Sequence, residues 1–189
     1  QDLLFEGRVG AAEAAMQRLQ GNQKAFGAFQ AFGSLYLQFD DMRGSERYVR
    51  DLDLDSASAM VTYRCNNTIF TRHYFVSYPD QVFVGRLEAA PKDDHATETP
   101  SFSFDAYFVS EQKGEVAANE NQLLIKGTVH ANCGIDAPDG DEKNGMRYGM
   151  CVRFLPKDGT VTALENGHIR VENASSVVVI AALATDYAN

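Results

Sequence analysis

Alternation of apolar and polar residues with a period of two is the feature that most constrains this chain. In one segment, Phe102, Phe104 and Phe108 fall on the same face. Ser103 and Asp105 fall on the opposite face. Because successive side chains of a β-strand point to opposite faces of the sheet, this pattern predicts a half-buried strand.

The same alternation predicts about ten strands between residues 32 and 184. They cover residues 32–39, 57–64, 69–77, 81–89, 101–110, 123–129, 146–155, 160–164, 168–172 and 177–184. No helical pattern lies between them, whereas parallel strands need a crossover of about a dozen residues or more. We therefore expect a mainly β fold, in which an antiparallel meander forms a large β-sandwich of the super-sandwich type.

Turn residues separate these strands. Asn66 and Asn67 connect two of them, and consecutive asparagines tolerate the positive φ of a tight hairpin. Further turn signals lie at residues 78–80, 156–159, 165–167 and 173–175. Two segments without a strand pattern, residues 91–100 and 132–145, are expected to be irregular.

The first twenty residues follow a helical period instead. The residues on the apolar face are Leu4, Ala11, Ala12, Ala15, Met16 and Leu19. They predict one helix over residues 2–20, weakened by Gly7 and Gly10 and stopped by Gly21 and Asn22. No internal repeat or second boundary follows, so we expect a single domain over residues 1–189.

The charge balance excludes two classes of partner. The chain has 26 acidic and 17 basic residues and a formal charge of −9, without a cluster of Lys and Arg. Neither nucleic acid nor an anionic membrane surface is therefore an expected partner. The longest apolar run, residues 177–184, is far shorter than the roughly 18 residues of a membrane-spanning helix. Residues 1–20 do not resemble a signal peptide, and a chain that begins with Gln leaves its compartment unknown.

We expect no metal or other cofactor. Cys65, Cys133 and Cys151 are odd in number and widely spaced, which is typical of buried thiols rather than of disulfides or a zinc motif. His130 and Cys133, three residues apart, could supply two ligands of a metal site, but no other residues with comparable spacing supply the remaining ligands. The acidic loop at residues 136–142 has oxygen ligands for calcium but lacks the EF-hand spacing, so a solvated turn is the simpler interpretation.

The sequence signals for catalytic residues are also weak. Lys92, Asp93, Asp94 and His95 form a polar loop without a nearby nucleophile, and His73 fits a structural histidine within a strand. The sequence contains no glycine-rich phosphate loop and does not mark a carboxylate pair of the kind that glycosidases use.

The chain has no Trp, which argues against a free-standing carbohydrate-binding module, although its eight Tyr could serve instead. Two glycosylation sequons occur, Asn66-Asn67-Thr68 and Asn173-Ala174-Ser175, and they matter only if a eukaryote secretes the chain.

Several motifs nevertheless occur in a specific order. They are FGSLYL at 32–37, YVRDLDLDSA at 48–57, VTY at 61–63, FTRHYFVS at 70–77, PDQV at 79–82 and AALATDY at 181–187. In this order and spacing they resemble the N-terminal domain of glycoside hydrolase family 95, the α-L-fucosidase family. The resemblance is strongest over residues 48–87. Two departures are that His73 replaces a more usual acidic residue and that the family's opening strands do not precede the helix.

The resemblance implies a parent enzyme that hydrolyses terminal α-L-fucosyl linkages of glycans with inversion. It implies that a Glu general acid, and an Asn and an Asp that activate water, lie in an (α/α)6 barrel following Tyr187. No catalytic residue therefore falls in residues 1–189. This chain alone is expected to be an inactive structural domain that packs against the barrel. A glycan hydrolase also favours a periplasmic or secreted location.

The sequence leaves three alternative functions open and predicts one further partner, a second copy of the chain. The parent could be an α-L-galactosidase, since L-galactose differs from L-fucose by one hydroxyl at C6. It could also be a phosphorylase-type relative, or the chain could be a non-catalytic carbohydrate-binding β-sandwich. Because an unpaired strand edge tends to recruit another chain, we also expect a homodimer through such an edge.

Overall fold

The computed structural model describes residues 2–17, 31–40, 44–93, 97, 99–112, 114–129 and 146–187. These residues form two short helices, α1 (Asp2–Phe5) and α2 (Val9–Gln17). The strands are β1 (Gly33–Phe39), β2 (Glu46–Asp53), β3 (Ser58–Cys65), β4 (Thr68–Ser77), β5 (Val82–Pro91), β6 (Phe102–Ser110), β7 (Gly114–Asn119), β8 (Gln122–Val129), β9 (Met146–Pro156), β10 (Thr160–Ala163), β11 (Ile169–Ala174) and β12 (Ser176–Thr185).

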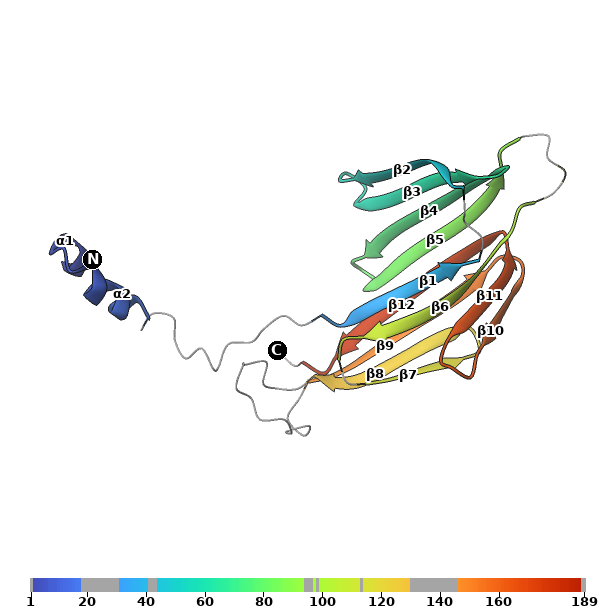
Figure 1. The fold of residues 1–189 in the computed structure, drawn as a ribbon. Helices are drawn as coiled ribbons and strands as arrows, with labels where there is room; N and C mark the ends of the chain where they lie inside the picture. The colour runs from blue at the N-terminus through green and yellow to red at the C-terminus, as the bar shows by residue number, and fades with distance from the viewer. Residues whose placement is uncertain are drawn as a thin grey trace.

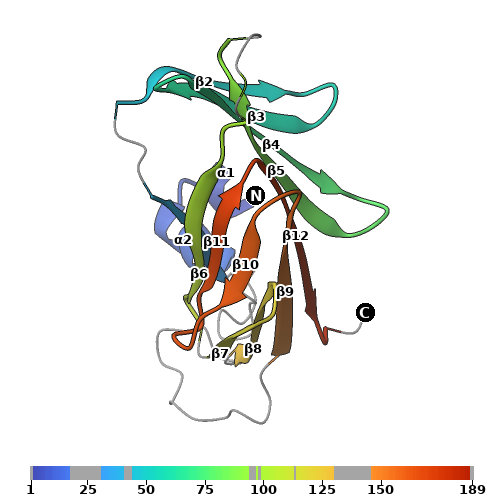
Figure 2. The same cartoon turned by 90° about the vertical axis from the view of Figure 1, so that its right-hand side faces the viewer.

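The strands form two sheets (Figure 1). The small sheet has four strands in the order β1-β6-β11-β10, and the large sheet has eight in the order β2-β3-β4-β5-β12-β9-β8-β7. Neighbouring strands in both sheets run antiparallel. The strands β2 to β4 extend beyond the small sheet at the top of both views (Figures 1 and 2). The predicted mainly β sandwich is confirmed.

All ten predicted strands are present, and the structure adds β2 and β7. Every residue of β2 is exposed, and β7 has only two half-buried positions. Both are edge strands of the large sheet. Because β2 has no buried face and β7 packs only Val116 and Ala118 against the core, neither shows the longer alternation from which the other strands were predicted.

The predicted N-terminal helix is divided into two pieces. Gly7 adopts a φ of 72° between α1 and α2, a conformation that ends a helix. The Gly7 N–H donates to the Leu4 carbonyl at 3.1 Å, which closes the last turn of α1. Both helices lie clear of the sheets in Figure 1. Residues 18–22, with the predicted helix stop, lie outside the described residues. Neither helix has the length and apolar character needed to cross a membrane.

The turn chemistry agrees with the sequence. Asn66 has a φ of 54° in the hairpin between β3 and β4, where Cys65 pairs with Thr68. Gly159 has a φ of 82° in the turn between β9 and β10, and a Cβ there would clash with the Glu172 carbonyl. Asn173, with a φ of 55°, precedes the point where the chain crosses from β11 in the small sheet to β12 in the large sheet.

The core lies between the facing sheets. Phe104 of β6 and Phe154 of β9 are both fully buried, and their ring centroids are 6.2 Å apart. The alternation predicted for β6 is confirmed, since the side chains expected to point inward are buried. The buried cluster comprises Tyr63, Cys65, Phe70, Leu87, Ala89, Phe102, Phe104, Ala106, Phe108, Leu123, Ile125, Tyr148, Val152, Phe154, Ile169, Val171, Ala174, Val177, Val179 and Ala181.

Phe104→Ala is expected to lower the free energy of unfolding by about 3–5 kcal/mol, because it removes a fully buried ring and leaves a cavity. Urea unfolding of the two chains, followed by circular dichroism, measures this difference. The control is Tyr78→Ala, because Tyr78 is 86% exposed and its loss should cost within about 0.5 kcal/mol. Equal losses in the two variants would contradict the assignment of the core.

Candidate functional site

The outer face of the small sheet gathers polar and aromatic side chains from β1, β6 and β11. Alternation along each strand sends every second residue away from the core, so side chains far apart in sequence become neighbours. This surface, called here the outer face of the small sheet, consists of Ser34, Tyr36, Gln38, Asp40, Ser103, Asp105, Tyr107, His168, Arg170 and Glu172.

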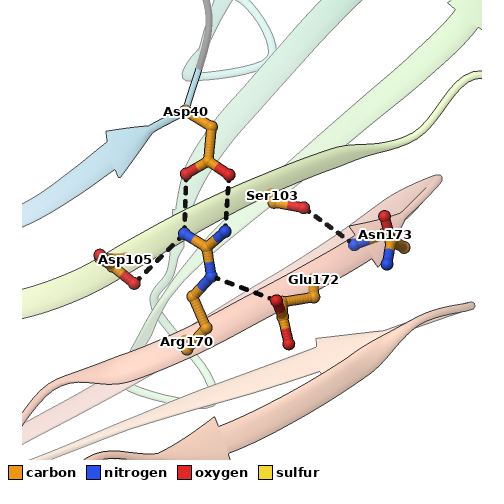
Figure 3. Close-up of polar contacts among 6 residues, drawn as sticks. All are labelled: Asp40, Ser103, Asp105, Arg170, Glu172 and Asn173. Carbon is orange, nitrogen blue, oxygen red and sulfur yellow. Dashed lines mark hydrogen bonds and ion pairs between the residues drawn. The ribbon is translucent and has the colours of Figure 1, made fainter.

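Arg170 is the centre of this face (Figure 3). Its two terminal nitrogens donate to the two carboxylate oxygens of Asp40 at 2.7 and 2.6 Å. One of them also lies 3.3 Å from Asp105, which pairs with Arg170 across β6 and β11. The Arg170 Nε lies 3.8 Å from Glu172. A bidentate guanidinium–carboxylate pair is both strong and directional, so this cluster joins the end of β1 to β6 and β11.

The electrostatics of the cluster keep Asp40 ionised. Hydrogen bonds from Arg170 lower the pKa of the Asp40 carboxyl below its ordinary value. The same hydrogen bonds to Asp40 raise the pKa of the Arg170 guanidinium. A general acid in glycoside hydrolysis needs the opposite, a carboxyl whose pKa is raised. The chemistry of Asp40 therefore suits positioning and recognition rather than proton donation.

A row of stacked rings lies beside the Arg170 cluster. Tyr36 of β1 and Tyr107 of β6 are register partners, with ring centroids 5.1 Å apart and planes inclined by 9°. His168, which precedes β11, stacks on the other side of Tyr107 at 4.8 Å. Tyr36 is 47% exposed and lies on the edge strand β1, so its ring is open to contact. Aromatic rings beside polar side chains can contact the apolar face of a sugar or a protein surface.

Arg72 lies on the other side of the small sheet, between the two sheets. It donates a 2.8 Å hydrogen bond to the Tyr63 hydroxyl, and its guanidinium carbon lies 4.3 Å from the Phe39 ring centroid. Burial raises the pKa of Tyr63. These contacts link β4 to β1 across the margin of the sandwich, where a stacked guanidinium stabilises the core boundary.

The structure places the cysteines and histidines of the sequence analysis apart from one another. Cys65 is buried in the core, Cys151 is half-buried on β9, and His73 is half-buried on β4 beside Phe75. Among the described residues, no group of three or more His, Cys, Asp or Glu could hold a metal ion. Cys133, His130 and the acidic loop at 136–142, for which predictions were made from the sequence, lie outside the described residues.

The polar loop and the sequons are only partly described. Lys92 and Asp93 are exposed, whereas Asp94 and His95 lie outside the described residues. Asn66 and Asn67 are exposed in the β3–β4 hairpin, and Asn173 is exposed before the crossing to β12. An open hollow of about 480 Å³ lies beside the hairpin, and its lining is Asn67, Thr68, Pro91, Thr97, Thr99, Pro100 and Ser101.

A second polar link holds the β11–β12 crossing in place. The Asn173 N–H donates to the Ser103 hydroxyl at 3.0 Å (Figure 3). The Ser175 hydroxyl hydrogen-bonds Asp158 in the turn that precedes β10. The Asn173 backbone therefore helps to hold this crossing, with or without a glycan on its side chain.

Sequence reasoning missed the Arg170 cluster because its members are far apart in the chain. Arg170 and Asp40 are 130 residues apart, and only the sheet order brings them together. The one available signal was the polar face of β6, on which Asp105 was identified. An outward charge inside a strand can be a pairing residue, but the sequence does not show its partner.

Comparison with known proteins places the chain among glycoside hydrolase domains. The family model described as glycosyl hydrolase family 65, N-terminal domain, matches residues 1–189. A protein of Arabidopsis thaliana named alpha-L-fucosidase 2 is 27% identical over 191 residues, which cover 93% of this chain. A protein of Aspergillus oryzae named probable alpha-fucosidase A is 21% identical over 170 residues, or 90% of this chain.

A protein of Aspergillus niger, also named probable alpha-fucosidase A, is 30% identical over 89 residues, which cover 47% of this chain. The chain spans only about a fifth of the length of the two relatives that it matches over most of its length, 22% of each.

Arg170→Gln is expected to lower the free energy of unfolding by about 1–2 kcal/mol near neutral pH, since it leaves Asp40 and Asp105 without their cation. Because the folded-state pKa of Asp40 is lowered, its contribution is present above the ordinary Asp pKa of about 3.9 and is lost as the pH falls below it. The difference between wild type and variant should therefore shrink in acid, as urea unfolding from pH 7 to pH 3 can measure.

The matched control for this prediction is Arg86→Gln. Arg86 pairs with Glu88 at 2.6 Å, but the Arg86 side chain is 58% exposed, so its loss should cost within about 0.5 kcal/mol. A stability difference for Arg170→Gln that stays constant from pH 7 to pH 3 would contradict the assigned role of Asp40.

Proposed function

Because this chain belongs to the glycosyl hydrolase family 65 N-terminal domain family, we propose that it is the N-terminal structural domain of an α-L-fucosidase-like glycoside hydrolase. The observation that carries the proposal is the match of 93% of the chain to a part of a protein named alpha-L-fucosidase 2. The ordered motifs at residues 48–57, 70–77 and 79–82 support the finer assignment to glycoside hydrolase family 95.

The proposed reaction is hydrolysis of terminal α-L-fucosyl linkages of glycans with inversion. In this proposal the general acid and the water-activating residues belong to a catalytic (α/α)6 barrel outside residues 1–189. The lowered pKa of Asp40 supports a non-catalytic role for the polar cluster in this domain, since that carboxyl is poorly suited to protonate a leaving group. The domain then supports the barrel and contributes no catalytic residue of its own.

The test compares the complete protein with the 189-residue chain on a chromogenic α-L-fucoside. The complete protein should release fucose, with the β-anomer as the first product in a proton NMR time course, as inversion requires. The 189-residue chain alone should give no turnover above buffer. Fucoside hydrolysis by the 189-residue chain itself would contradict the structural role.

Two further substrates separate the alternative parents. Faster turnover of the α-L-galactoside than of the α-L-fucoside would assign the parent as an α-L-galactosidase, a difference that depends on one hydroxyl. Turnover that requires phosphate would assign a phosphorylase-type reaction. Either result would replace fucoside hydrolysis as the proposed activity.

A carbohydrate-binding function is the second candidate, and the stacked Tyr36, Tyr107 and His168 favour it. Their rings lie beside Gln38 and Asp105, which can hydrogen-bond sugar hydroxyls. Calorimetric titration of the 189-residue chain with fucosylated oligosaccharides tests this function. Binding that is lost in Tyr36→Ala would support it, whereas the structural-domain proposal expects no binding.

We also propose a homodimer through the edge of β1. The outer edges of the two sheets are β1, β10, β2 and β7. Strand β10 has only four residues, and β2 carries a register shift and five charged side chains, both of which discourage pairing. Strand β7 has six residues and carries Glu115, whereas β1 has seven residues and none is charged, so the edge of β1 is the best template for a second chain.

Light scattering of the 189-residue chain at tens of micromolar should give the mass of a dimer. The double variant Ser34→Lys and Gln38→Lys should be monomeric, because it places like charges across a two-fold pairing of β1. The control is Thr160→Lys and Thr162→Lys on β10, the opposite edge of the same sheet, and it should remain dimeric. A monomeric wild type would contradict the proposal.

A further inference from the structure

Strand β12 is apolar on both of its faces. Its inward residues Val177, Val179 and Ala181 are at most 7% exposed and pack in the core. Its outward residues are Val178, Ile180 and Ala182, which are half-buried or exposed. A strand that is apolar throughout is typical of a sheet covered on both sides, and β12 lies near the centre of the large sheet.

Neighbouring strands extend this apolar surface on the outside of the large sheet. Ile180 pairs with Val84 of β5, and Val84 pairs with Phe75 of β4. On the other side of β12, Val178 pairs with Leu155 of β9 and Ala182 with Cys151, but Ile180 pairs with Arg153. The surface, called here the outer patch, consists of Phe75, Val82, Val84, Leu124, Cys151, Leu155, Val178, Ile180 and Ala182.

The outer patch contains large side chains that water can reach. Phe75 is 38% exposed, Leu124 is 40% exposed and Leu155 is 41% exposed. Charged side chains lie among and around them: Arg153 opposite Ile180, Arg86 opposite Val178 and paired with Glu88, and Lys126, which pairs with Glu115. Exposed apolar side chains together with arginines are the composition of a protein interface.

The small sheet provides the contrast within the same molecule. Its outer face carries Asp105, Arg170 and Glu172, as expected for a sheet that faces water. The outward face of the large sheet is mixed at its centre: Ile180 pairs with Arg153 and Val178 pairs with Arg86, whereas Val84, Ile180, Ala182 and Cys151 adjoin one another. The small sheet covers only the inward face of these strands, so the apolar residues of the outer patch would be buried only by a second layer.

The described chain ends on this same sheet. Asp186 follows β12 and receives hydrogen bonds from both the backbone N–H and the side-chain Nε of Arg147, each at 2.7 Å. Its own N–H donates to the Arg147 carbonyl at 3.0 Å. These contacts hold Asp186, directly after β12, against β9. The matched region is 22% of the length of the Arabidopsis thaliana protein, so most of that protein lies outside the match.

We propose that the outer patch is the docking surface for the catalytic region of the same polypeptide, whose apolar side chains cover β5, β12 and β9. The inference rests on the proposed function, because it takes its occupant from the larger protein. Burial of the outward residues of β12 by this region would explain why β12 is apolar on both faces. It would also couple the stability of the sandwich to that of the catalytic region.

Cys151 is a reporter within the outer patch. Its side chain is half-buried and faces outward, whereas Cys65 is buried in the core. The experiment follows alkylation of Cys151 by peptide mass spectrometry in the 189-residue chain and in the complete protein. Docking should slow the reaction about tenfold or more in the complete protein, since the thiol then reacts only after local opening. Equal rates would overturn the inference.

Leu155→Lys tests the same surface with a variant. Leu155 is 41% exposed in the 189-residue chain, so the substitution should leave that chain folded, with a thermal midpoint close to wild type. In the complete protein it should restore rapid alkylation of Cys151, because it adds a charge where Leu155 meets Val178 in the proposed interface. The control is Val49→Lys on the outward face of edge strand β2, where Val49 is 58% exposed, and Cys151 should stay protected.

The remaining outcomes separate this inference from the proposed function. A complete protein that hydrolyses the fucoside but alkylates Cys151 as fast as the 189-residue chain overturns the docking surface and leaves the proposed function in place. A complete protein that protects Cys151 but hydrolyses no glycoside supports docking and overturns the proposed function alone. Protection of Cys151 in the 189-residue chain that increases with concentration would assign the patch to a second copy, and would overturn the inference.

Discussion

The contact between the inward faces of the two sheets is the interaction on which the rest of the structure depends. Phe104 and Phe154 meet at its centre with no exposed surface, and the buried residues of β5, β8, β11 and β12 surround them. A two-stranded hairpin cannot bury enough apolar area to be stable in water, whereas facing sheets can. The buried core between the sheets therefore positions the polar side chains on the outer faces, although those side chains point away from it.

The two outer faces of the sandwich differ in chemistry. The small sheet carries the Arg170 cluster and the stacked rings of Tyr36, Tyr107 and His168, which suit a solvated surface. The large sheet carries Val178, Ile180, Val84 and Cys151 together with Arg86 and Arg153, a mixture that suits the proposed docking surface. This difference between the two faces supports the proposed interface, and the chain spans 22% of the length of each of two relatives.

Ten of the twelve strands in the described residues could be predicted from their apolar patterning, nine of them from alternation and β12 from an apolar run. The two exceptions have different causes: β2 is exposed along its whole length, and β7 is a short edge strand with only Val116 and Ala118 packed against the core. The helix was predicted in the right place, but Gly7 divides it. The Arg170 cluster could not be predicted from the sequence, because Asp40 and Arg170 are separated by 130 residues.

The sequence by itself determined the fold class, the inward residues of β6 and the hairpin at Asn66, because strand period and turn conformation are local properties of the chain. The ordered motifs of residues 48–82 likewise indicated a glycoside hydrolase domain, which the family match confirmed. Only the tertiary structure decided which strands are neighbours. That order placed Asp40 beside Arg170 and set β12 between β5 and β9, because pairing between distant strands depends on how the whole chain packs.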